Sequence, residues 1–192
     1  MFFQSLAFRV KRIAYVGKVF EGLNKEFWIG HLLVMVSTVL GVYLAAHSGL
    51  KSAIEFDSIA SDRDNYYLRA NLRDEVLYNI SIAESIIKTI NKIGTFDRRN
   101  YPNFQTYVLD TMKEQSNTLK TPNIILNGTL QYYGSVHDLL EQRQRHLISY
   151  TQLAGSLRKT IDRFRTDVIR VMDNDLASLK QRLESNGVKL YY

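Results

Sequence analysis

The chain has 192 residues, a formal net charge of +6, no cysteine and two prolines. The lack of cysteine excludes disulfides, thiolate metal sites and a cysteine nucleophile. Residues 51–192 hold 20 basic and 17 acidic side chains, which is a mixed, solvated surface rather than a nucleic-acid-binding stripe, so no nucleic-acid partner is expected.

Residues 1–26 combine an apolar helical stripe with basic side chains on the opposite side. The stripe comprises Phe2, Leu6, Ile13, Val16, Phe20 and Leu23, and the lysines that face away from it are Lys11, Lys18 and Lys25. This pattern predicts an amphipathic segment at the membrane surface, with its lysines toward anionic lipid. An equally supported alternative is that the stripe packs on the membrane helices of a partner protein, and a mitochondrial presequence is a third interpretation.

Residues 27–50 form the longest apolar stretch. No Asp, Glu, Lys or Arg occurs from residue 27 to residue 46, and Trp28 and Tyr43 lie where interfacial aromatic residues are expected. A bilayer core about 30 Å thick requires roughly 20 apolar residues in a helix, so the stretch predicts a single transmembrane helix that acts as an uncleaved signal anchor. The alternative is a buried helix of a soluble protein.

Small residues recur every four positions within this predicted span, at Ser37, Gly41 and Ala45. We call these three residues the small-residue seam. Such seams allow a neighbouring helix to approach closely, because packing rather than hydrophobicity drives helix association in lipid. The sequence therefore predicts a helix-packing face, with other membrane-protein subunits or further copies of the chain as partners.

The basic residues that flank the span predict its orientation. Five Lys and Arg residues precede it, whereas Lys51, Arg63 and Arg69 follow within about twenty residues and are mixed with acidic side chains. This bias favours an N-terminus inside and a C-terminal domain outside. We expect the inner (cytoplasmic) membrane with a periplasmic domain, and the mitochondrial inner membrane is the alternative.

Residues 51–192 are expected to form one extracytoplasmic helical domain. A helix over residues 51–93 carries a core stripe of coiled-coil spacing, and Gly94 is its predicted C-cap. The stripe comprises Leu72, Val76, Ile80, Ala83, Ile87 and Ile90. A polar turn follows at residues 95–101, and Pro102 predicts the start of a second helix that reaches about Leu119.

Thr121 and Pro122 predict the start of a third helix, and an apolar stripe from Leu153 to Leu183 predicts a fourth. No Pro or Gly cluster separates these two helices. Either a short turn lies at residues 146–151, or one helix continues from residue 122 to residue 185. A continuous helix of about 95 Å would be hard for the rest of the domain to cover, so we favour an all-α fold in which an antiparallel four-helix bundle follows the transmembrane helix.

The sequence contains no glycine-rich phosphate loop, zinc-binding pattern or nucleophile elbow. His31 and His47 lie near opposite ends of the span, which disfavours haem ligation. His137 and Glu141 have i, i+4 spacing, but no second pair could complete a metal site, so Glu141 is expected to pair with Arg145. The basic residues 158–170 are interpreted as an exposed, salt-bridged helix, and a docking face for an acidic partner is the alternative. We therefore expect no cofactor, no metal and no catalytic residue.

These patterns favour a non-catalytic, single-pass membrane protein that acts as an accessory or scaffolding subunit of a larger membrane complex. The alternative is an oligomeric, membrane-anchored sensor or ligand-binding helical domain of chemoreceptor-like type. An enzyme is the least favoured class, because no cluster of convergent titratable residues is visible.

Overall fold

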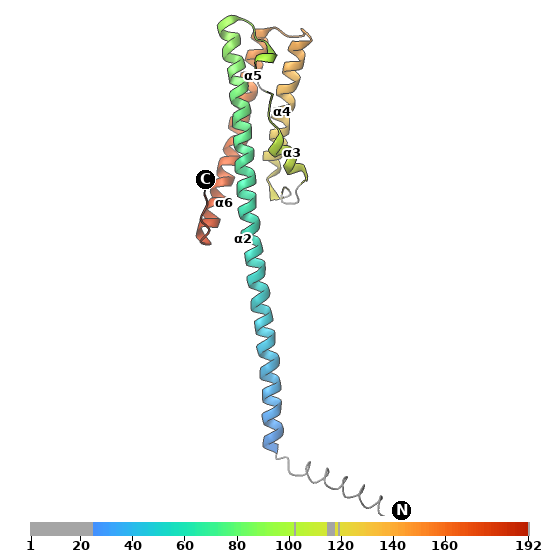
Figure 1. Cartoon of the computed structure of the whole chain (residues 1–192), viewed down its shortest axis with the longest axis vertical. Coiled ribbons are helices and arrows are strands. Elements are labelled where there is room, and N and C mark those ends of the chain that lie inside the picture. Colours follow the sequence, from blue (N-terminus) through green and yellow to red (C-terminus); the bar gives the residue numbers. More distant parts are fainter. Residues whose placement is uncertain (1–24, 102, 115–117, 119, 192) are drawn as a thin grey trace, which may run out of the picture. The chain divides into compact units, whose positions relative to one another are not determined.

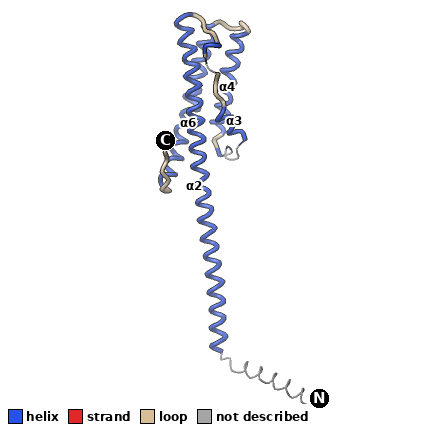
Figure 2. The backbone as a smooth tube through the Cα atoms, in the orientation of Figure 1, coloured by secondary structure: helices blue, strands red, loops and turns tan. Residues whose placement is uncertain are grey.

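The structure is a computed structural model that describes residues 25–101, 103–114, 118 and 120–191. Over these residues it contains helices and no strands (Figures 1 and 2), which confirms the predicted all-α class. The predicted membrane-surface segment lies outside the described residues, apart from Lys25 and Glu26. Its lysines Lys11 and Lys18 are therefore not placed by the structure.

Helix α2 (Lys25–Ile93) includes the predicted span and the predicted helix of residues 51–93. The chain divides into two compact units, and the second of them begins at Phe56. Every side chain from residue 25 to residue 55 is exposed in the first unit. Gly94 ends the helix as predicted, because it adopts φ +76°, which favours glycine, and its N–H donates to the Ile90 carbonyl at 2.8 Å.

The core of the second unit is built on the α2 stripe that the sequence predicts. All six stripe residues are at most 5% exposed. They pack in one cluster with buried side chains of α3 (Tyr107–Glu114), α4 (Asn123–Gln144), α5 (Tyr150–Phe164) and α6 (Arg170–Ser185). A smaller cluster joins Tyr66 of α2 to Leu179 and Leu183 of α6. The second half of α2 therefore packs against the other helices of this unit along most of its length.

The second helix is shorter than predicted. A 3₁₀ turn, η1 (Arg98–Asn100), follows α2, and α3 begins only at Tyr107 rather than at Pro102. The reason lies in α2: the Asn79 carboxamide holds both backbone groups of Gln105, with Nδ2 to the carbonyl at 2.6 Å and Oδ1 to the N–H at 2.8 Å. The backbone at Gln105 is thereby fixed by α2 immediately before the helix starts.

A short turn separates α4 from α5, so the third and fourth helices are not continuous. His146 in this turn has φ 60°. Ser149 and Gln152 form a capping box, in which the Ser149 hydroxyl accepts from the Gln152 N–H at 3.1 Å and the Gln152 side chain accepts from the Ser149 N–H at 2.8 Å. A π-helical turn, η3 (Arg165–Ile169), then connects α5 directly to α6, which ends at Ser185 as predicted.

Candidate functional site

The apolar first part of α2 is the first candidate site. Among the described residues, α2 is the one helix long and apolar enough to cross a membrane, and it lies near the N-terminus. Its large apolar side chains are exposed, including Trp28 at 58% and Tyr43 at 64%. The three residues of the small-residue seam, Ser37, Gly41 and Ala45, lie on successive turns of this helix, and all three are exposed. A Cβ added to Gly41 would meet nothing within 4 Å.

The two histidines of this segment contact aromatic neighbours on their own helix. His31 Nδ1 lies 3.1 Å from the Phe27 carbonyl oxygen, and its ring centroid is 4.1 Å from that of Phe27. His47 stacks on Tyr43 with ring centroids 6.2 Å apart. Both histidines therefore have local partners at the ends of the apolar segment.

A buried polar cluster in the second unit was not foreseen from the sequence. Glu75 of α2 is 7% exposed, and its carboxylate accepts from the N–H groups of Val108 at 2.6 Å and Leu109 at 3.4 Å. These donors belong to the first turn of α3, so a carboxylate from another helix caps it. The Tyr133 hydroxyl links this cap to Asn79, because it accepts from Nδ2 at 2.7 Å and donates to Glu75 at 3.4 Å.

Ion pairs connect α2 to α6. Arg69 is 5% exposed, and it donates to Asp175 at 2.6 Å and to the Lys120 carbonyl at 2.5 Å. One turn further along α2, Arg73 pairs with Asp173 at 2.5 Å on a more exposed surface. Each aspartate thus pairs with an arginine about 100 positions earlier in the chain. Sequence spacing alone does not predict these pairs.

The other polar residues considered in the sequence analysis lie in surface ion pairs or line a pocket. Glu141 pairs with Arg145, as predicted. His137 and Glu141 both line a pocket between α4 and the segment that precedes α3. No group of three His, Asp or Glu side chains in the described part of the chain is arranged to hold a metal ion. From the basic residues 158–170, Arg165 pairs with Glu84 of α2 at 2.7 Å.

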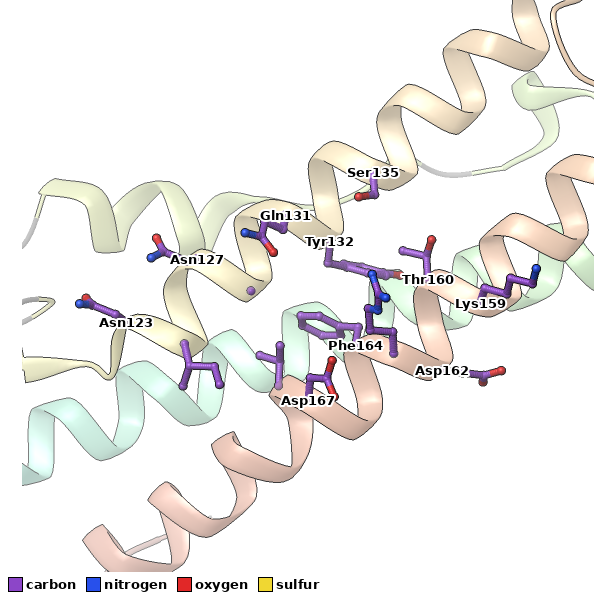
Figure 3. Close-up of a pocket in the computed structure, with 14 residues that line it drawn as sticks. Asn123, Asn127, Gln131, Tyr132, Ser135, Lys159, Thr160, Asp162, Phe164 and Asp167 are labelled. Atoms are coloured by element: carbon purple, nitrogen blue, oxygen red, sulfur yellow. The ribbon is translucent and has the colours of Figure 1, made fainter.

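A groove between α4 and the α5–η3 segment has a volume of about 870 Å³. We call it the α4–α5 groove (Figure 3). Uncharged polar side chains line its α4 side at every fourth position: Asn123, Asn127, Gln131 and Ser135. Charged residues line the other side: Lys159, Asp162, Arg163 and Asp167. Within the described part of the chain, none of these eight side chains makes a hydrogen bond or ion pair.

The floor of the groove contains an unpartnered hydroxyl. Tyr132 is 2% exposed and stacks on Phe164 with ring centroids 4.5 Å apart, yet its hydroxyl has no hydrogen-bond partner among the described residues. Burial raises the pKa of this hydroxyl, which keeps it protonated. An unsatisfied buried polar group costs about 1–3 kcal/mol, so this hydroxyl is expected to lower the stability of the protein.

The backbone around the groove departs from regular helix packing at two points. The π-helical turn η3 contributes Asp167 and Val168 to the lining, and π turns occur frequently at functional sites. Gly128 of α4 faces Val168 so closely that an added Cβ would lie 2.4 Å from a Val168 methyl group. The glycine therefore permits the close approach of α4 to η3 at this position.

Comparisons of the chain with protein-family models, with curated proteins and with solved structures give no match. The described residues thus define the protein as a helical chain with one N-terminal apolar helix that is able to act as a membrane anchor.

Proposed function

We propose that the protein is a non-catalytic, single-pass membrane protein that acts as an accessory or scaffolding subunit of a larger membrane complex. In this proposal residues 27–50 span the inner membrane, the N-terminus lies inside, and residues 51–192 form a periplasmic antiparallel bundle. The observation that carries the proposal is the exposed apolar segment of α2, which includes the small-residue seam.

The physical argument starts from the cost of this exposure. Burying one large apolar side chain is worth about 1.5–3 kcal/mol, and residues 27–50 expose fourteen of them. A contiguous apolar surface of this kind requires a cover. At 1.5 Å per residue, 24 helical residues extend about 36 Å, enough to cross the roughly 30 Å hydrocarbon core, so lipid supplies most of the cover.

A partner helix is proposed to cover the seam. Gly41 offers a helix surface without a side chain, and a Cβ added there would meet nothing within 4 Å. In lipid, close backbone approach gains van der Waals contact that side chains on both helices would prevent. The seam is therefore the part of the span best suited to another membrane-protein subunit.

The test substitutes the seam. Gly41→Leu should detach the protein from the complex that co-purifies with it in mild detergent, while the circular dichroism of the second unit stays unchanged. Val39→Leu is the matched control, because Val39 lies on the opposite side of the helix and is 68% exposed. Retention of the complex by Gly41→Leu, or equal loss with both variants, would contradict the proposal.

The alternative role, an oligomeric ligand-binding domain, is favoured by one observation. The α4–α5 groove gathers eight polar side chains without partners in the described residues, next to an unpartnered buried hydroxyl. Solvated helix faces are common, but the volume of this groove lies in the range of ligand pockets, and apolar residues such as Tyr132, Phe164 and Val168 line it beside the polar groups.

A further inference from the structure

We propose that the α4–α5 groove binds a short zwitterionic peptide in an extended conformation. Its ammonium group would lie at Asp167, its carboxylate between Lys159 and Arg163, and its backbone along Asn127 and Gln131. This inference goes beyond the subunit role, and it rests on the alternative role as a ligand-binding domain because it names the ligand class.

The first argument is the charge distribution along the α5–η3 side. Lys159, Arg163 and Asp167 follow one another at four-residue intervals, and Asp162 lies between the two cations in sequence, so one end of the segment has a net positive charge and the other end is negative. Figure 3 shows Lys159 and Asp167 on the same continuous helical segment, separated by about two turns. Asp162 also belongs to the lining, so the four charged groups sum to zero. A neutral ligand with opposite charges at its two ends fits this arrangement.

The second argument is length. At the α-helical rise of 1.5 Å per residue, Arg163 lies about 6 Å from Lys159 along the axis of α5, and Asp167 lies about one further turn along, in the π-helical turn η3. An extended peptide rises about 3.3 Å per residue, so three residues span about 10 Å. A tripeptide is therefore long enough to place its ammonium at Asp167 and its carboxylate between the two cations.

The third argument is the amide pattern on α4. A carboxamide carries both a donor and an acceptor, which is the complement of a peptide group. Asn127 and Gln131 are one turn apart, about 6 Å, and alternate residues of an extended chain are about 6.6 Å apart. Both side chains are exposed, and neither has a hydrogen-bond partner among the described residues. They are free to pair with successive backbone amides of a bound peptide.

The experiment is isothermal titration calorimetry of the full chain in detergent micelles, with trialanine as the probe. Trialanine should bind, and N-acetyl-trialanine and trialanine amide should each bind about tenfold more weakly, because each lacks one charge-assisted hydrogen bond. Absence of binding at millimolar trialanine, or equal binding of all three probes, would overturn the proposal.

Variants assign each terminus to its residue. Asp167→Asn should weaken the binding of trialanine about tenfold and leave the binding of N-acetyl-trialanine unchanged. Lys159→Gln combined with Arg163→Gln should weaken the binding of trialanine about tenfold and leave the binding of trialanine amide unchanged. Matched controls outside the groove are Asp138→Asn on α4 and Arg158→Gln on α5. All five positions are exposed, so the fold should be unaffected. Unchanged affinity in the groove variants would refute the assignment.

A trisaccharide, maltotriose, serves as the competing probe. Groove-dependent binding of maltotriose in place of trialanine would assign the groove to carbohydrate and overturn the peptide proposal. Co-purification of the membrane complex tests the subunit role, whereas calorimetry tests the peptide site. The two proposals can therefore fail independently.

Discussion

Two adjacent tyrosines show how differently one residue type behaves in this interior. Tyr133 hydrogen-bonds to Asn79 and Glu75, whereas the Tyr132 hydroxyl is buried with no partner among the described residues. Burial raises the pKa of both hydroxyls, so both remain protonated at neutral pH. Replacing each tyrosine by phenylalanine therefore compares the free-energy contribution of an unpaired buried hydroxyl with that of a hydrogen-bonded one.

Tyr132→Phe is expected to raise the free energy of unfolding by about 1 kcal/mol, because it removes a polar atom that no described group satisfies. Tyr133→Phe should lower it by a similar amount, because Asn79 loses an acceptor and Glu75 loses a donor. Urea denaturation of the full chain in detergent measures both. A loss of stability in Tyr132→Phe would show that the hydroxyl is satisfied in solution.

At this scale, the sequence predicted the residues whose burial depends on local spacing. The α2 stripe from Leu72 to Ile90 is buried because its period matches one helix face. The buried Glu75 and Asn79 could not be predicted in the same way. Their partners, the backbone groups of residues 105, 108 and 109, come close only after the chain has turned back on itself.

Among the elements, α2 carries the longest buried face. Ile87→Ala should lower the free energy of unfolding by about 2–5 kcal/mol, and Phe164→Ala on α5 should lower it by about 3–5 kcal/mol, since both side chains are at most 5% exposed. Ile93→Ala is the control, because Ile93 is 61% exposed and its loss should change the value by less than about 0.5 kcal/mol. Chemical denaturation compares the three, and near-zero losses for the first two would mean that these faces are not core.

The two ion pairs between α2 and α6 should differ sharply in their contribution. Asp175→Ala leaves Arg69 as a buried, unpaired charge and is expected to cost about 3–5 kcal/mol. Asp173→Ala breaks an exposed pair with Arg73 and should cost at most about 1 kcal/mol. Thermal unfolding of both variants tests this, and equal costs would show that Arg69 finds another anion.

Element boundaries were predictable where a residue acts on its own backbone. Gly94 ends α2 and residues 185–187 end α6, because a glycine in each place adopts φ +76°. The start of α3 was predicted too early, since Pro102 suggests a helix start but Asn79 and Glu75 decide it from α2. The charged side of the α4–α5 groove was read as a solvated helix face, because spacing along one helix does not show which helix lies opposite.

For the whole molecule, the charge bias around residues 27–50 predicts the topology. A phosphatase reporter fused after Tyr192 should be active outside the cytoplasm, because five Lys and Arg residues precede the span and fewer follow it closely. The same reporter fused after Lys25 is the matched control and should be inactive. Activity in the second fusion but not the first would reverse the proposed orientation and place the groove inside the cell.

The long sequence separation between α2 and α6 has a consequence for how the chain is made. Arg69 and Asp175 are 106 residues apart, whereas α4 and α5 are joined by a short turn. At about 5–20 residues per second, a ribosome delivers the α6 partner roughly 5–20 s after the arginine. The α4–α5 hairpin can form as it emerges, but the apolar face of α2 must wait for its last covering helix. During that interval part of the apolar face of α2 stays uncovered, so the incomplete chain is more prone to aggregate than the finished one.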